Sequence, residues 1–144
     1  MKVQVINKSN NKLPEYATSG SAGLDLRAFL EAPIHIYPGD IKLIHTGIHM
    51  QLPLGYEARI QPRSGLALKH GITVLNAPGC IDCDYTGEVG VILINHSQKT
   101  FTIEPGDRIA QMIVSKYEQV EWDETDALNK TERGEGGFSH TGVK

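Results

Sequence analysis

Short runs in which apolar and polar residues alternate most constrain what this chain can fold into. A period of two places successive side chains on opposite faces of a strand, so that one face is buried and the other is solvated. Turn sequences such as Pro38-Gly39-Asp40 separate the runs, because proline fixes φ and glycine accepts a positive φ. Many short strands with regular turns predict an all-β sandwich or barrel. The alternating runs are Val3/Val5, Leu24/Leu26/Ala28, Ile34/Ile36, Ile48/Met50/Leu52, Tyr56/Ala58/Ile60 and Phe101/Ile103.

Three segments depart from this alternation. Val89–Ile94 is apolar almost throughout, which predicts a strand buried on both faces. Ser64–Gly71 has a serine for an N-cap, basic residues in its last turn and a final glycine, which predicts a helix of one or two turns. Beyond residue 117 the chain becomes acidic and then glycine-rich. We therefore expect a body over residues 1–117 and an extended C-terminal arm over residues 118–144.

Composition limits the kind of protein this is. A chain of 144 residues fits one domain with a real core. Its net charge of −3 argues against general binding to nucleic acid, which needs a basic surface. No apolar run approaches the roughly 20 residues of a membrane helix, and the first residues lack the apolar stretch of a signal peptide. These features predict a cytoplasmic protein that binds neither membranes nor nucleic acid.

Cys80 and Cys83 form the only Cys-x-x-Cys of the chain. A structural zinc site needs a second pair of ligands, and no matching Cys/His pair is evident. A thioredoxin-type motif needs a helix after the first cysteine, whereas a strand pattern follows here. The sequence therefore predicts two buried, reduced thiols.

The segment Asn76–Gly87 carries two aspartates and a tyrosine beside a Thr-Gly turn. Aspartate is a poor strand former, so its presence within a strand pattern has two interpretations. The aspartates could hydrogen-bond the backbone of a turn. The segment could instead be a hairpin that holds a ligand and offers a carboxylate as general base.

Three further residues, Ser64, Asp25 and Gln111, are similarly ambiguous. Ser64 fits a helix cap, but a helix N-terminus beside Arg63 also fits an anion site. Asp25 lies on the same strand face as Arg27, which suits either a surface ion pair or a carboxylate near the water shell of a metal. Gln111 is a polar residue in apolar company.

Taken in order, five of these segments resemble the five motifs of the trimeric dUTP diphosphatase (dUTPase) family. The segments span most of the chain, and the differences fall at Ala77-Pro78 and Cys80, where the family varies. The resemblance implies an all-β distorted jelly roll of the β-clip type with one short helix. It also implies a homotrimer whose active sites lie between subunits, each covered by a neighbour's C-terminal arm. The matching segments are Ala22–Ala28, Pro62–Gly71, Asn76–Gly87, Gly106–Ile113 and Arg133–Gly142.

The reaction implied by the resemblance is hydrolysis of dUTP to dUMP and pyrophosphate with Mg2+ on the triphosphate. This reaction supplies the precursor of dTMP and limits uracil in DNA. By similarity, Asp82 is the general base for the attacking water, and Asp25 supports the magnesium shell through water. The residues implied to hold phosphate oxygens are Arg63, Ser64, Gly65 and Gln111, with Arg133 and Ser139 of the tail.

The resemblance also assigns selection of the base and sugar. The uracil would be read by the backbone around Cys80, Ile81 and Asp82 and at Gly90, together with Asn76. The ring of Tyr85 would pack under the deoxyribose, and Phe138 would stack over the uracil.

Two rival readings remain. A dCTP deaminase of the same superfamily uses a glutamate from a central strand, but Val89–Asn95 contains no acid. A non-enzymatic β-sandwich binding module would carry these motifs as relics, which intact Asp82, Arg63 and tail residues argue against.

Overall fold

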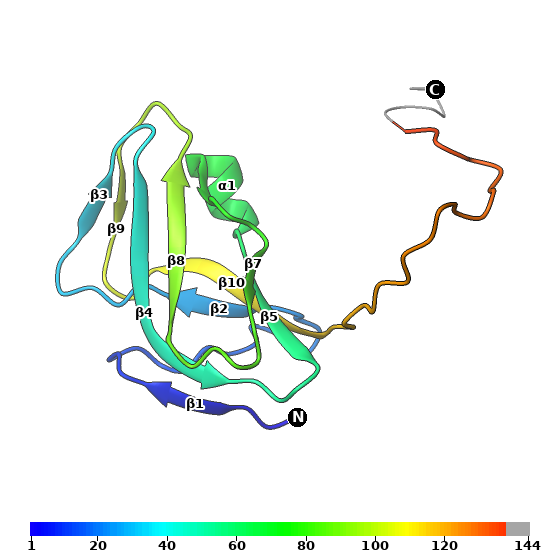
Figure 1. The fold of residues 1–144 in the computed structure, drawn as a ribbon. Helices are drawn as coiled ribbons and strands as arrows, with labels where there is room; N and C mark the ends of the chain where they lie inside the picture. Colours follow the sequence, from blue (N-terminus) through cyan, green and yellow to red (C-terminus); the bar gives the residue numbers. More distant parts are fainter. Residues whose placement is uncertain (138–144) are drawn as a thin grey trace.

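The computed structural model describes residues 1–137 of the chain. Figure 1 shows a body of antiparallel strands with a single short helix. The predicted all-β fold with one short helix is therefore confirmed. The elements in order are β1 (Gln4–Asn7), β2 (Leu24–Arg27), β3 (Ile34–Ile36), β4 (Ile41–Gln51), β5 (Tyr56–Gln61), α1 (Ser64–His70), β6 (Ile72–Val74), β7 (Gly79–Ile81), β8 (Glu88–Asn95), β9 (Phe101–Ile103) and β10 (Arg108–Lys116).

Two four-stranded sheets form the body. One has the strand order β1-β4-β8-β6, the other has the order β2-β10-β5-β7, and β3 and β9 make a separate pair. Inward side chains of both large sheets belong to one hydrophobic cluster, which includes Ile44 and Val91 from the first and Leu26 and Ile60 from the second. Burial of this shared apolar area holds the two sheets together.

Strand β8 differs from the prediction of burial on both faces. Val89, Val91 and Leu93 are fully buried, whereas the residues between them are only half-buried. The outward face continues onto β4, where the side chain of Leu43 is 57% exposed. A run of apolar residues predicts that both faces of a strand are buried, but it does not identify the surface that covers each face. The prediction was wrong for the single chain because only one face of β8 meets the chain's own core.

Helix α1 begins at Ser64, one residue earlier than predicted, because the sequence assigned Ser64 as the N-cap. Ser64 is the first helical residue, and Arg63 is the N-cap, without a capping hydrogen bond from its side chain. The cap prediction for Ser64 was therefore wrong. The predicted end is confirmed: Gly71 has φ of 65° and its N–H binds Ala67 O and Leu66 O. A Cβ on Gly71 would also lie 2.9 Å from the backbone nitrogen of Ser97, so this position requires glycine.

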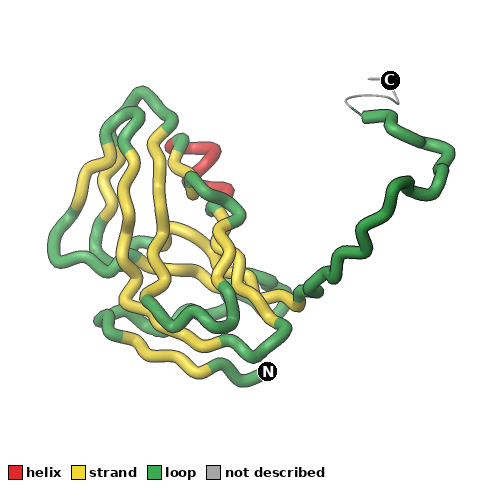
Figure 2. The backbone as a smooth tube through the Cα atoms, viewed as in Figure 1, coloured by secondary structure: helices red, strands yellow, loops and turns green. Residues whose placement is uncertain are grey.

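The segment after β10 leaves the body. Residues 118–137 contain no helix or strand and run away from the sheets as an extended arm (Figures 1 and 2). The predicted roles of Phe138 and Ser139 fall outside the residues that the structure describes. Within the described chain, no helix has the length and apolar character needed to cross a membrane.

Asn95 is a fully buried polar side chain that ties β8 to the β3–β9 side of the body. Its amide donates to Ile36 O at 2.9 Å and to Lys99 O at 2.8 Å, and its oxygen accepts from Ser97 N at 2.8 Å. Asn95→Leu would leave these buried partners unsatisfied, so we expect the free energy of unfolding to fall by about 2–4 kcal/mol. Urea unfolding at fixed protein concentration measures this free energy. Ser97→Ala, which removes the hydrogen bond from Ser97 Oγ to Asn95, is the milder control. A loss no larger than that of the control would contradict the assignment.

Candidate active site

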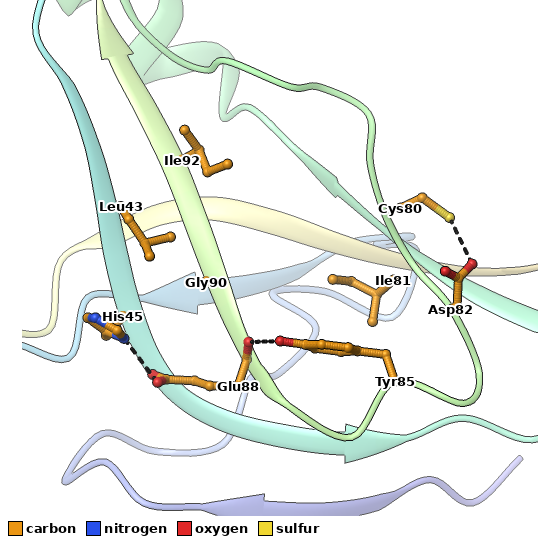
Figure 3. Close-up of a pocket in the computed structure, with 9 residues that line it drawn as sticks. All are labelled: Leu43, His45, Cys80, Ile81, Asp82, Tyr85, Glu88, Gly90 and Ile92. Carbon is orange, nitrogen blue, oxygen red and sulfur yellow. Dashed lines mark hydrogen bonds and ion pairs between the residues drawn. The ribbon is translucent and has the colours of Figure 1, made fainter.

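A cavity of about 350 Å³ lies between β7 and β8. Figure 3 shows its lining side chains, which come from β4, β7, β8 and the turn between β7 and β8. Five were predicted for the site, namely Cys80, Ile81, Asp82, Tyr85 and Gly90, and the structure brings them together here. Four were missed, namely Leu43, His45, Glu88 and Ile92. Leu43 and His45 reach the pocket only because β4 pairs with β8, and no local sequence pattern indicates that pairing.

The two strands that border this pocket are not paired with each other. Strand β7 pairs with β5, and β8 pairs with β4 along its length and with β6 only from Leu93 to Asn95. The edge of β7 and the first half of β8 therefore leave backbone N–H and C=O groups available across the pocket. A flat ligand carrying both donors and acceptors can bind such edges as a further strand would.

Glycine and tyrosine shape the pocket at two positions. A Cβ on Gly90 would lie 2.8 Å from Leu43 Cδ1, so the backbone at this position stays open while Leu43 forms the wall. The hydroxyl of Tyr85 donates to Glu88 O at 2.9 Å, and its ring lies against Gly87 of the turn. This hydrogen bond fixes the ring across the turn between β7 and β8.

The carboxylate of Glu88 closes one side of the pocket. It accepts from Gly47 N at 2.8 Å and Thr46 N at 3.1 Å, and it contacts His45 Nδ1 at 2.9 Å. Burial would raise the pKa of Glu88, but the Gly47 N–H and the His45 ring hold it below its usual value. The sequence disfavours a dCTP deaminase because Val89–Asn95 contains no acid. Strand β8 begins one residue earlier, at Glu88, so it does contain one acid. These contacts give that acid a structural role.

Asp82 is exposed in the pocket and is linked to a buried carboxylate behind it. The Cys80 thiol contacts Asp82 Oδ1 at 3.7 Å and Glu57 Oε2 at 3.3 Å. Glu57 is only 7% exposed, and it is paired with Arg59 and accepts from Ser115 Oγ at 3.3 Å. The Arg59 hydrogen bond, then the thiol, lower the pKa of Glu57 against the effect of burial. Glu57 is thus a fixed anion next to the Cys80 thiol.

The two cysteines are free thiols, but the prediction that both are buried was wrong. Cys80 is exposed and Cys83 is half-buried, because Cys80 lies in the edge strand β7 and Cys83 lies in the turn that follows it. The hydrogen bond to Glu57, then burial and the charge of Asp82, raise the pKa of Cys80 to about 11.

This pKa gives a pH-dependent prediction. A raised folded-state pKa stabilises the protein below the ordinary thiol value of 9.0, and that contribution is lost as pH rises towards about 11. We expect the unfolding free energy to fall across this window, and Cys80→Ser to remove that part of the fall. Thiolate absorbance in a Cys83→Ala background should show one thiol that titrates near 11, moving lower in Glu57→Gln. A thiol that titrates near 9 in the folded protein would contradict the arrangement.

A second cluster lies at the start of α1, which we call the arginine corner (Asp25, Arg63, Arg108 and Gln111). Asp25 binds Arg63 Nε at 3.1 Å and Arg108 Nη1 at 3.0 Å, and Gln111 Nε2 donates to Pro62 O at 3.0 Å. Ser64 and Gly65 follow directly as the first residues of α1. Arg63 and Arg108 line a small pocket here together with Asp107, and their guanidinium groups are fork-shaped donors that suit an anion.

The arginine corner changes the interpretation of Asp25. Its expected partner Arg27 instead donates to Gly106 O at 2.9 Å, and Asp25 pairs with Arg63 and Arg108. The sequence assigned no role to Arg108, because Arg108 reaches Asp25 only through the pairing of β2 with β10.

The remaining predicted residues lie apart from these two clusters. Asn76 contacts the start of β7, where a Cβ on Gly79 would lie 3.0 Å from Asn76 Nδ2, and it does not line the pocket. Arg133 lies in the arm and donates from Nε to Gly136 O at 2.7 Å. In the described residues of one chain, the pocket and the arginine corner share no lining residue.

Comparison with known proteins agrees over nearly the whole length. Residues 9–142 match the model of the dUTPase family. The deoxyuridine 5'-triphosphate nucleotidohydrolase of Finegoldia magna is 54% identical over 142 residues, which cover 99% of each chain. That of Rickettsia bellii is 57% identical over 143 residues, which cover 99% of this chain and 95% of the relative.

Solved structures show the same fold. The dUTPase of Staphylococcus bacteriophage 80alpha, solved with dUPNHPP, has a TM-score of 0.88 over 99% of both chains at 24% identity. A variant dUTPase of phage phi11 of S. aureus, described with a structural Mg(II) ion, has a TM-score of 0.81 at 20% identity over 90% of this chain and 100% of that one. The fold, the family model and relatives at more than half identity lead to one conclusion: the chain belongs to the dUTPase family of nucleotide-hydrolysing enzymes.

Proposed function

We propose that this chain hydrolyses dUTP to dUMP and pyrophosphate, with the uracil bound between β7 and β8. The observation that carries the proposal is the pocket between two unpaired strand edges that holds both Asp82 and Tyr85. The reaction would supply the precursor of dTMP and limit uracil in DNA.

Selection of the base follows from the backbone groups of the pocket. Uracil offers two carbonyl acceptors and the N3–H donor, and cytosine reverses part of this pattern. Backbone at Cys80, Ile81 and Gly90, with Asn76 near the start of β7, supplies the complement. Each mispaired buried polar group costs about 1–3 kcal/mol, which disfavours cytosine. The Tyr85 ring packs under the deoxyribose, and the narrow slot excludes thymine's methyl group.

In the chemical step Asp82 acts as general base. It accepts a proton from the water that attacks the α-phosphorus, and the bond from that phosphorus to the pyrophosphate leaving group breaks. Arg63, Ser64, Gly65 and Gln111 hold phosphate oxygens. Because a carboxylate is a weak base, alignment of the water supplies most of the reduction in the barrier. The exposed position of Asp82 at the pocket supports this role.

The residues present fit a magnesium ion that the substrate carries. Among the described residues, no three His, Cys, Asp or Glu side chains gather to form a cage. Magnesium is often held by one carboxylate with substrate phosphates and water. Asp25 fits that pattern through water, because both of its oxygens already bind arginines. When bound, the ion neutralises phosphate charge and polarises the phosphorus.

The separation of the pocket from the arginine corner supports a shared site in a homotrimer. In such a trimer the substrate would lie between the pocket of one subunit and the arginine corner of another. Residues 118–144 form the arm that closes over the site, with Phe138 stacking on the uracil and Arg133 and Ser139 on the phosphates. The extended course of the described part of the arm supports a docking surface on a neighbour (Figure 1).

One assay tests the proposal most directly. Pyrophosphate release should be measured with each deoxynucleoside triphosphate in the presence of Mg2+, together with ammonia release from dCTP. We expect pyrophosphate from dUTP alone. Ammonia from dCTP would indicate a deaminase, and tight dUTP binding without turnover in calorimetry would indicate a binding module.

A further inference from the structure

The Cys-x-x-Cys formed by β7 and the turn after it has no side-chain role in the mechanism above. Its two thiols flank Asp82 and reach the same sheet: Cys80 contacts Glu57 of β5, and Cys83 contacts Tyr117 directly after β10. We propose that both thiols are positioning residues, which clamp the Asp82 segment to the β5–β10 sheet and orient its carboxylate. This inference rests on the proposed role of Asp82 as general base.

Cys80 is the first anchor. Its sulfur lies 3.3 Å from Glu57 Oε2 and 3.7 Å from Asp82 Oδ1, so its one S–H is shared between a buried carboxylate and, more weakly, an exposed one (Figure 3 shows the Asp82 contact). Glu57 is itself fixed by Arg59 and Ser115. An exposed aspartate samples several rotamers, and a hydrogen bond to a fixed group narrows that choice. The shared thiol hydrogen therefore favours one orientation of the Asp82 carboxylate.

Cys83 is the second anchor, one residue beyond Asp82. Its sulfur lies 3.5 Å from the Tyr117 hydroxyl, and its side chain packs against the hydrophobic core. Tyr117 N–H donates to Gly55 O at 3.1 Å, which extends the ladder between β5 and β10 past Lys116. The bond to Cys83, followed by burial, raises the pKa of Tyr117. The anchor also lies where the C-terminal arm leaves the body.

The state of the Cys80 thiol suits a clamp better than chemistry of its own. With a pKa of about 11, Cys80 stays protonated and keeps donating throughout the neutral range. Nucleophilic attack, metal binding and disulfide exchange all require a thiolate. Positioning is therefore the use of this thiol that its surroundings favour.

The test compares variants that keep or remove each anchor. Cys80→Ala should lower kcat for dUTP by about 3- to 10-fold, the value of one hydrogen bond, with KM within about 2-fold of wild type. Cys80→Ser, which keeps a donor, should recover most of that loss. Tyr117→Phe removes one oxygen outside the hairpin and should lower kcat by about 2- to 5-fold. Thermal melting establishes that each variant is folded.

Distinct outcomes overturn the clamp. Unchanged kcat in Cys80→Ala and in Tyr117→Phe would do so, as would a serine variant as impaired as the alanine variant. A rise in KM alone would assign Cys80 to binding instead. If Cys80→Ala does not fold, the kcat of Tyr117→Phe alone tests the clamp. Wild-type protein without dUTP turnover, or Asp82→Asn with full turnover, would instead remove the proposed function itself.

Discussion

Asp82→Asn is expected to abolish turnover of dUTP while leaving nucleotide binding intact. Asparagine keeps the size of the side chain and an oxygen that can accept from the Cys80 thiol, but it cannot take a proton from water. General-base catalysis contributes about 10²- to 10⁴-fold, so kcat should fall by at least that range. Pyrophosphate release measures kcat, and calorimetry with a non-hydrolysable imido analogue of dUTP measures binding.

The chain offers a matched control for this variant. Asp84 is also exposed and lies two residues further along the same hairpin, but it does not line the pocket. Asp84→Asn makes the same change of charge and should leave kcat within about 2-fold of wild type. Near-normal turnover by Asp82→Asn would remove Asp82 as the base. Equal losses in both variants would assign the effect to the charge of the hairpin.

The sequence predicted the body well because local patterns encode its strands. The alternation at Tyr56/Ala58/Ile60 marks β5, and Gly71 ends α1 as its place after two basic residues predicts. Ser64 was misplaced because a serine before a helical run fits both the cap and the first turn. The outward face of β8 was misjudged because periodicity counts apolar residues and cannot identify the surface that covers them.

The candidate site divides in the same way. Asp82 and Tyr85 stand out locally, since acids and a tyrosine beside a Thr-Gly turn are unusual in a strand pattern. His45 has no such signal, because it meets Glu88 only through the pairing of strands 43 residues apart. Glu57 is equally silent in sequence, where it is one acid within an alternating run. Its contact with the Cys80 thiol exists only after β5 and β7 pair.

Deletion of residues 133–144 is expected to leave a folded protein with severely reduced activity. The hydrophobic core contains buried residues only up to Met112, and residues 118–137 add no strand to either sheet. The melting temperature and oligomeric state should therefore stay close to those of the full chain. Loss of the residues proposed to position the uracil and phosphates should lower kcat/KM by about 10²-fold or more, because small misplacements of a substrate have effects of that size.

A complementation experiment shows which subunit the arm serves. In a mixed assembly of the proposed trimer, an Asp82→Asn subunit lacks the proposed base but keeps its arm, whereas a truncated subunit keeps the proposed base but lacks the arm. If the arm covers a neighbour's site, refolding the two variants together should restore activity above the sum of the separate preparations. An arm that closed over its own subunit would give no gain on mixing. Full activity of the truncated protein alone would show that catalysis does not require the arm. The truncation therefore tests whether the arm is required, and the mixing experiment tests which subunit's site it covers.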